Sequence, residues 1–167
     1  MDIVVANRQR QRKINRRLMK QIVNALLAEL KIEKAEIGIC LVRAPEMTRL
    51  NETFLKHKGS TDVIAFDYAY NVGQASRLPQ EPLKRKMDRR DACPTLHGDI
   101  FICVEEAVRQ ARKFGTIWQS EIVRYLIHGV LHLLGFDDAR AAARRKMKRE
   151  ENRLLREITR RFSLSKL

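Results

Sequence analysis

The chain has 167 residues, of which 44% are hydrophobic. This length suits a single domain over residues 1–167, and the hydrophobic fraction argues against an intrinsically disordered chain. No uncharged apolar run approaches the roughly 20 residues of a membrane-spanning helix. The apolar block at residues 1–6 is also too short for a signal peptide. We therefore expect a soluble, cytoplasmic protein without membrane contact.

The chain is strongly basic, with 34 Lys and Arg residues against 20 Asp and Glu residues and a net charge of +14. Such an excess disfavours a compact fold through self-repulsion unless a polyanion offsets it. Nucleic acid fits this role, because each phosphate that the protein neutralises releases condensed cations. A generally basic proteome is the alternative explanation. The charge balance predicts contact with nucleic acid.

The first half of the chain alternates strand and helix patterns. Residues 1–7 predict a short edge strand, and residues 11–31 predict an amphipathic helix with a basic outer face. Residues 35–43 have apolar or small side chains on both faces, which is typical of a strand covered on both sides. A short helix over 45–57 and a strand over 61–66 follow.

The second half is predominantly helical. Residues 69–94 hold prolines and a basic cluster, and we predict a mobile basic insertion there. A strand is predicted over 96–104, with helices over 104–114, 117–134 and 139–162. Helix 117–134 is apolar nearly all round, so we expect it to be central and buried. These elements predict an α/β (α+β) fold, a small mixed sheet of about four strands packed with about five helices.

Two histidines lie four residues apart in the predicted central helix. His128 and His132 would share one face, with about 5–6 Å between their Cβ atoms, so both imidazoles can bind one metal ion. Gly135 permits a left-handed turn that folds the chain back. Asp138 is then placed to be the third ligand, with Asp137 as its near competitor. The pattern predicts a metal site of His128, His132 and Asp138, with zinc as the first candidate ion.

The alternative is that both histidines are hydrogen-bonded core residues. Two of them on one stripe of an apolar helix are harder to explain in that way, because each buried imidazole needs partners. Zinc proteases with this spacing carry a glutamate after the first histidine as general base. Gly129 takes that position here, which disfavours a peptidase. The metal would instead polarise a phosphoryl oxygen or lower the pKa of a bound water.

Residues 128–137 resemble the signature His-Gly-x-Leu-His-Leu-x-Gly-[Phe/Tyr]-Asp-His of the YbeY endoribonuclease family. Leu50 and Asn51, followed by residues 61–66, resemble the family's Leu-Asn…Pro-Thr-Asp-Val-Leu-Ser-Phe stretch, and residues 98–102 resemble its Gly-Asp-Ile strand. The resemblance implies a single-strand-specific endoribonuclease acting in 16S rRNA 3′-end maturation and ribosome quality control. It also implies ribosomal RNA, the small ribosomal subunit and an Era-type GTPase as partners.

Two positions depart from the family pattern. The family's third metal histidine falls on Asp138, whose negative charge makes a bound metal a weaker Lewis acid. Two histidines and a carboxylate also suit iron(II) or another divalent metal. The family's active-site arginine falls on Leu55. We expect Lys56 or Lys58 to take its catalytic role, without the bidentate fork of arginine, and His57 to be a candidate substrate contact.

Two predicted helices carry a large share of the positive charge. Helix 139–162 has ten basic residues against three acids, and residues 3–28 contain no acid. Such runs are usually solvated faces. We expect these two to hold RNA phosphates as well, with Arg16, Arg17 and Arg145 as candidate substrate-binding residues.

Two further acids are expected near the metal site. Asp62 and Asp99 are predicted to orient groups around the metal-bound histidines.

The leading hypothesis is a metal-dependent endoribonuclease. The first alternative is a ribosome- or RNA-binding protein that keeps a structural metal and has little catalysis. The second, which Gly129 argues against, is a metalloprotease.

Overall fold

The structure is a computed structural model that describes residues 1–68 and 95–167. The predicted basic insertion at 69–94 lies outside the described residues. In chain order the elements are β1 (Asp2–Asn7), α1 (Arg16–Glu29), β2 (Lys34–Val42), α2 (Ala44–Leu50), the π-helical turn η1 (Asn51–Leu55), β3 (Val63–Asp67), β4 (Thr95–Cys103), α3 (Val104–Phe114), α4 (Trp118–Leu133), α5 (Ala141–Arg161) and the 3₁₀ turn η2 (Leu164–Lys166).

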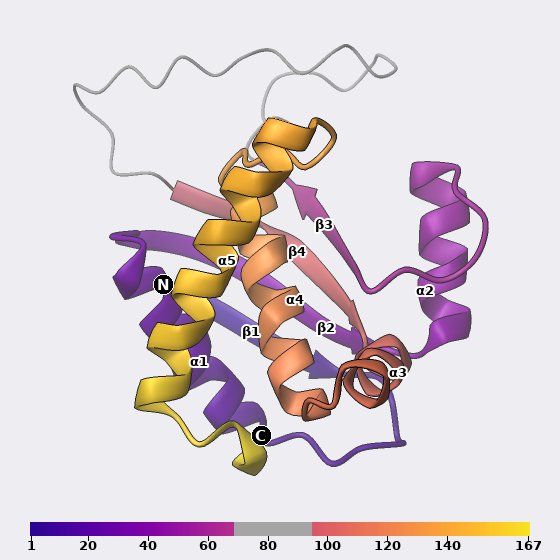
Figure 1. Cartoon of the computed structure of the whole chain (residues 1–167), viewed down its shortest axis with the longest axis horizontal. Helices are drawn as coiled ribbons and strands as arrows, with labels where there is room; N and C mark the ends of the chain where they lie inside the picture. Colours follow the sequence, from indigo (N-terminus) through magenta and orange to yellow (C-terminus); the bar gives the residue numbers. More distant parts are fainter. Residues whose placement is uncertain (69–94) are drawn as a thin grey trace.

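A mixed four-stranded sheet forms the centre of the fold (Figure 1). The strand order is β1-β2-β4-β3; β1, β2 and β4 are parallel, and β3 runs antiparallel to β4. β1 is an edge strand, as predicted. The predicted α/β architecture, with a small mixed sheet and helices α1 to α5, is confirmed.

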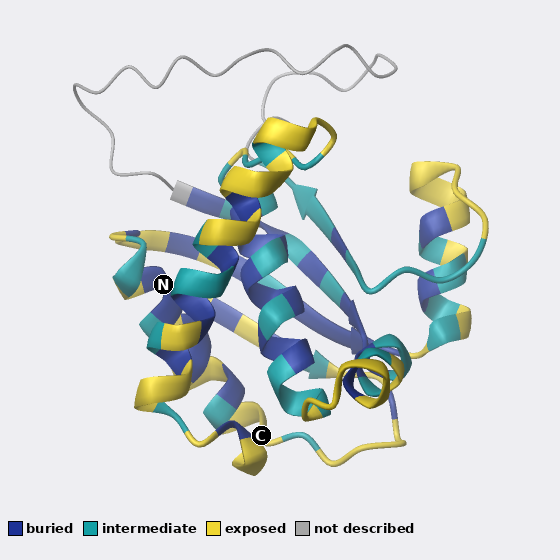
Figure 2. Cartoon of the chain, viewed as in Figure 1, coloured by how far each residue is buried: buried dark blue, intermediate teal, exposed yellow. Residues whose placement is uncertain are grey.

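The two faces of the sheet are covered by different helices. Ile37 and Ile39 of β2 are buried in the main core, to which α1, α4 and α5 also contribute (Figure 2). Cys40 and Val42 of the same strand pack in a smaller core with Met47 of α2. The prediction of a strand covered on both faces is confirmed for the C-terminal half of β2, where the burial pattern becomes continuous.

The prediction for the first helix was wrong at its N-terminus, because α1 begins only at Arg16. The Asn15 side chain accepts a hydrogen bond from the Leu18 N–H at 3.0 Å and so caps the helix there. Upstream, the Gln9 side chain accepts from the backbone N–H groups of Gln11 and Arg12 at 2.8 and 2.9 Å. These bonds satisfy the backbone in a non-helical form, so the basic residues before Asn15 are not on the helix.

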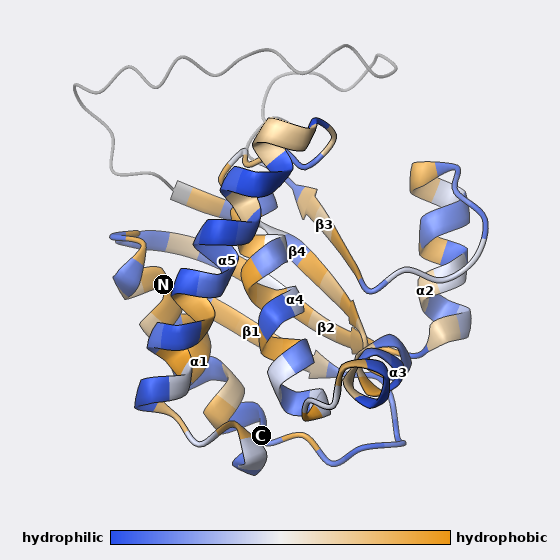
Figure 3. Ribbon diagram, viewed as in Figure 1, coloured by the Kyte–Doolittle hydropathy of each residue, from blue (hydrophilic) through white to orange (hydrophobic). Residues whose placement is uncertain are grey.

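Helix α5 separates apolar and charged faces. Met147, Leu154 and Ile158 are buried against the rest of the core, as predicted. Its other face is strongly hydrophilic, in contrast to the apolar strands (Figure 3). Within residues 1–68 and 95–167, no helix has the length and apolar character needed to span a membrane.

Helix α4 lies across the sheet and is buried along most of its length, as predicted. Leu126, Ile127 and Val130 have no exposed surface. Gly129 faces β4, and a Cβ atom there would lie 2.7 Å from Cγ2 of Ile100. The helix can approach the sheet this closely only because position 129 has no side chain. A glutamate, the general base of the zinc proteases, therefore does not fit there.

We predict that Gly129→Ala destabilises the protein despite the better helix propensity of alanine. Overpacking against Ile100 costs about 1–3 kcal/mol, whereas alanine in place of glycine contributes roughly 1 kcal/mol in a helix. Urea denaturation should show a net loss of stability. Gln21→Ala, at an exposed position of α1, is the control and should change stability by less than about 0.5 kcal/mol. A more stable Gly129→Ala variant would contradict the close packing of α4 on β4.

Candidate metal centre

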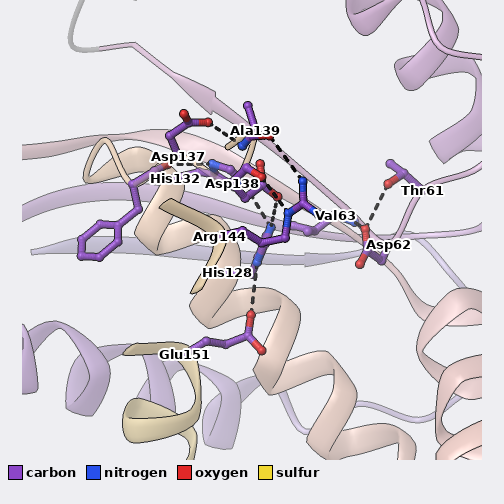
Figure 4. A network of polar contacts seen from close by, with 11 residues as sticks. Thr61, Asp62, Val63, His128, His132, Asp137, Asp138, Ala139, Arg144 and Glu151 are labelled. Carbon is purple, nitrogen blue, oxygen red and sulfur yellow. Dashed lines mark hydrogen bonds and ion pairs between the residues drawn. The ribbon is translucent and has the colours of Figure 1, made fainter. Parts of the chain in front are cut away.

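The C-terminal half of α4 places His128 and His132 side by side, because residues four apart share one helical face. Their Nε2 atoms lie 3.0 Å apart, and their ring planes meet at 79°. Figure 4 shows the two rings converging from the same helix toward Asp138. Both histidines are only partly buried, so the point on which their nitrogens converge is accessible from solvent.

A glycine turn brings Asp138 to the two histidines. Gly135 has φ +81°, and its N–H donates to the His132 carbonyl at 2.8 Å, so the chain reverses directly after α4. Asp138 Oδ2 lies 3.8 Å from His128 Nε2. Ligand atoms of His128, His132 and Asp138 all lie within 4.8 Å of one another. The carboxylate of Asp137 instead accepts from the Ala139 N–H at 2.9 Å, so of the two aspartates Asp138 is the one in the cluster.

Each histidine has an oxygen partner for its other ring nitrogen. His128 Nδ1 lies 3.2 Å from Oε2 of Glu151, and His132 Nδ1 lies 3.1 Å from the backbone oxygen of Phe136. When Nδ1–H donates to these oxygens, the Nε2 lone pair of each ring is left free. Both lone pairs are then available to one cation at the point where the rings converge.

The two histidines differ in their electrostatic surroundings. Burial lowers the pKa of His128, but the hydrogen bond and charge of Glu151, with the charges of Asp62 and Asp138, outweigh burial and raise it above the ordinary value. Burial and the neighbouring His128 lower the pKa of His132, and Asp138 only partly opposes them. The charges that face this cluster are thus largely negative, which favours a bound cation.

The donor set fits a divalent metal such as zinc. Zinc is bound at about 2.0–2.1 Å by histidine nitrogen, so two tetrahedral ligands lie about 3.3 Å apart. The observed separations of 3.0 and 3.8 Å bracket this value and need only small side-chain adjustments. Three protein ligands leave one position for water or substrate, as in catalytic zinc sites. The same set also suits non-haem iron(II).

The predicted substitutes for the family arginine lie outside the ligand cluster. Lys56, His57 and Lys58 are exposed on the segment that leads from η1 to β3, and Leu55 is 45% exposed. Lys56 takes a left-handed conformation with φ 59° at the end of η1. Among the described residues, no hydrogen bond or ion pair joins the side chains of Lys56, His57 or Lys58 to the three candidate ligands.

The predicted substrate-binding arginines lie in two separate places. Arg16 and Arg17 line a surface cavity of about 440 Å³ between α1 and β1. The helix that carries the two histidines, α4, packs against β3 and β4, and β3 is the edge strand opposite β1 in the sheet. Arg145 is exposed in the first turns of α5, close in sequence to the loop that carries Asp138. Of the three arginines, Arg145 is therefore the one that follows the ligand loop most closely in sequence.

Two residues around the cluster escaped the sequence-based prediction. Arg144 donates to the backbone oxygens of Asp138 and Ala139 at 3.0 and 3.3 Å and so holds the loop that carries the third ligand. Glu151 contacts His128 directly. Glu151 falls on the inward stripe of the last helix, four residues after Met147, and an acid at an apolar position is a signal that could have identified it.

The two acids predicted to orient the histidines lie on different sides of the sheet. The charge of Asp62 raises the pKa of His128, and its carboxylate accepts from the Val63 N–H at 2.9 Å. Asp99 was predicted wrongly: it packs against Gly38 and accepts from the Tyr68 hydroxyl at 2.9 Å. Its neighbour in β4, residue 98, faces α4, so the strand alternation turns Asp99 to the other face.

The family model described as "Endoribonuclease YbeY" matches residues 4–159, nearly the whole chain. The chain belongs to the YbeY family. A YbeY relative from Elusimicrobium minutum, named "Endoribonuclease YbeY", is 32% identical over 141 residues, which are 84% of this chain and 87% of the relative. A relative of the same name from Thermobifida fusca is 33% identical over 139 residues, which are 83% of this chain and 80% of the relative.

The fold also matches a solved structure. The solution structure of a Thermotoga maritima protein aligns with a TM-score of 0.57 at 21% identity, over 93% of this chain and 88% of that one. At this identity the match speaks for the shared fold. The His-Gly-x-Leu-His motif, on which the resemblance to the family rests, lies on α4 of this chain.

We predict that Asp138→Ala weakens metal binding and that Asp137→Ala does not. Asp138 supplies the third ligand atom of the cluster, whereas Asp137 caps the following backbone. Loss of one ligand should reduce affinity by at least about tenfold, the scale seen when even a supporting residue is removed. Competition with a chromophoric chelator measures both variants. Equal losses in the two variants would show that the loop, and not the Asp138 carboxylate, matters for binding.

Proposed function

We propose that this chain is a metal-dependent endoribonuclease that cleaves single-stranded RNA at the centre formed by His128, His132 and Asp138. The observation that carries the proposal is the convergence of three ligand atoms at a partly exposed point in a member of the YbeY family. The relatives are named endoribonucleases, enzymes that hydrolyse RNA phosphodiester bonds. The net charge of +14 is suited to a polyanionic substrate.

Different residues of the chain have different roles in this proposed mechanism. A divalent ion bound at the centre would supply charge to the scissile phosphate and lower the pKa of a water molecule. His128, His132 and Asp138 would hold this ion at a point that is partly exposed to solvent. Arg144 keeps the Asp138 loop in place through its two backbone contacts. We favour zinc, since two histidines and a carboxylate form a common catalytic zinc site.

The basic surfaces would bind the RNA at different distances from the cleavage point. Arg145 is exposed in the first turns of α5, just after the loop that carries Asp138, and would contact phosphates close to the scissile bond. Arg16 and Arg17 lie at the β1 edge of the sheet and would hold a more distant part of the strand. Lys56, Lys58 and His57 are exposed and free to reach a phosphate once RNA is bound, with the lysines in the catalytic role of the family arginine.

The cellular role follows from the YbeY resemblance. We propose that the protein acts in the cytoplasm on ribosomal RNA of the small subunit, in 16S rRNA 3′-end maturation and ribosome quality control. An Era-type GTPase is a further proposed partner. A co-sedimentation assay with purified small subunits would test the association.

We predict that His132→Ala lowers the rate of cleavage of a single-stranded RNA substrate by at least about a hundredfold. The variant lacks one metal ligand, so the cation that would stabilise the charge of the scissile phosphate is no longer held in place. His97→Ala is the matched control, since His97 lies on β4 and is paired with Glu36 at 3.7 Å. Cleavage is followed on a fluorescently labelled oligonucleotide. Equal cleavage by His132→Ala and the unaltered protein would favour the alternative, an RNA-binding protein with a structural metal.

We predict that the double variant Lys56→Ala/Lys58→Ala lowers cleavage by about tenfold or more while metal binding stays unchanged. The reason is loss of the positive charge that would stabilise the transition state. Lys113→Ala/Lys166→Ala removes the same charge at the end of α3 and in η2 and is the control. Unchanged kcat/KM in the Lys56/Lys58 variant would exclude these lysines as substitutes for the family arginine.

A further inference from the structure

Glu151 is a buried acid between the two helices that frame the metal centre. Its side chain is 7% exposed and lies on the apolar stripe of α5. Its two oxygens have different partners, both on α4. Oε1 accepts a hydrogen bond from Nη1 of Arg124 at 2.7 Å, and Oε2 lies 3.2 Å from Nδ1 of His128. Arg124 and His128 are four residues apart, so Glu151 contacts one face of α4 at two successive turns.

A role in stability alone explains only half of this arrangement. A buried carboxylate is costly unless an opposite charge compensates it, and Arg124 provides that charge. Arg124 also contacts Asn152 Oδ1 at 3.0 Å and Glu121 at 3.5 Å, so its orientation is fixed from several sides. The second oxygen of Glu151 is thereby left pointing at His128. A methionine or leucine at position 151 would serve packing equally well without a buried charge.

We propose that Glu151 is a positioning residue for the metal centre, which fixes the ring of His128 with Nδ1–H toward α5 and Nε2 toward the bound ion. This inference rests on the proposed metal site. A carboxylate that accepts from the non-ligating nitrogen orients the imidazole and makes it a stronger ligand. Arg124 acts one step further away, by holding Glu151 in register with His128. The interaction makes α5 a part of the metal centre although it supplies none of the three ligands.

The two histidines are thus held in different ways. His132 is oriented by the backbone oxygen of Phe136, which the turn after α4 holds in place. His128 depends on a side chain from another helix. A change at position 151 should therefore act on the His128 half of the site and leave the turn that presents Asp138 intact.

The test is zinc affinity, measured on the full chain by competition with a chromophoric chelator. We expect Glu151→Gln, which keeps an acceptor oxygen without the charge, to bind zinc about tenfold more weakly, and Glu151→Met to lose up to about a hundredfold. Glu150→Gln is the matched control: it removes the same charge from the neighbouring position of α5, where the acid pairs with Arg153. Its zinc affinity should equal that of the unaltered protein.

Thermal denaturation of the metal-free variants separates positioning from stability, because a purely structural role would lower the melting temperature and leave zinc affinity unchanged. Zinc affinity within about twofold of the unaltered protein in folded Glu151→Met would overturn the inference. If that variant does not fold, the same result in Glu151→Gln overturns it. Failure of the unaltered protein to bind zinc, iron(II) or another divalent metal would instead overturn the proposed function and this inference together.

Discussion

The packing of α4 against the sheet is the constraint on which the rest of the structure depends. Gly129 lets the helix approach Ile100 of β4 more closely than any side chain at that position would permit. The apolar residues of α4 are buried by this approach, and the half-buried face that remains carries His128 and His132. A rigid, buried helix gives the two imidazoles a fixed spacing. A catalytic metal site needs such precise placement of its ligands, and a helix provides it better than a mobile loop.

The charges of the protein are distributed in two zones. Asp138, Glu151 and Asp62 surround the histidines, with Arg124 paired to Glu151 and Arg144 bonded to the Asp138 loop. Most other basic residues of α1 and α5 lie on outer faces. Without a cation, the acidic centre would repel an RNA phosphate that the basic surface attracts. A bound divalent ion reverses the local sign, since it is the largest charge in such a site. Metal binding and RNA binding would therefore be coupled through electrostatics at the centre.

The departures from the YbeY pattern lie at the edge of this centre. Asp138 keeps the position of the third ligand but brings a negative charge, and Leu55 is 45% exposed on the surface beside two lysines. An Asp138 oxygen reaches the two histidines from the turn after Gly135. Where the resemblance implies an arginine, Leu55 offers no guanidinium, and the neighbouring positive charges are the flexible amines of Lys56 and Lys58. The three candidate metal ligands thus converge in the structure, whereas Lys56 and Lys58, the proposed phosphate contacts, lie outside their cluster.

Local sequence patterns determined the elements and the core of the metal motif. The histidine spacing, the helix-ending Gly135 and the apolar character of 117–134 act within a few residues. The sequence alone therefore predicted α4 and the face that carries both histidines correctly. The start of α1 was predicted wrongly. The apolar periodicity predicts helix before Asn15, but the side chains of Gln9 and Asn15 accept hydrogen bonds from backbone N–H groups there, and the helix begins only at Arg16. Only the tertiary structure decided that Glu151 faces His128, that Asp99 faces away from it, and that Arg16 and Arg17 lie at the far edge of the sheet. These contacts join residues distant in sequence, and they follow from strand order and helix packing, which no local periodicity contains.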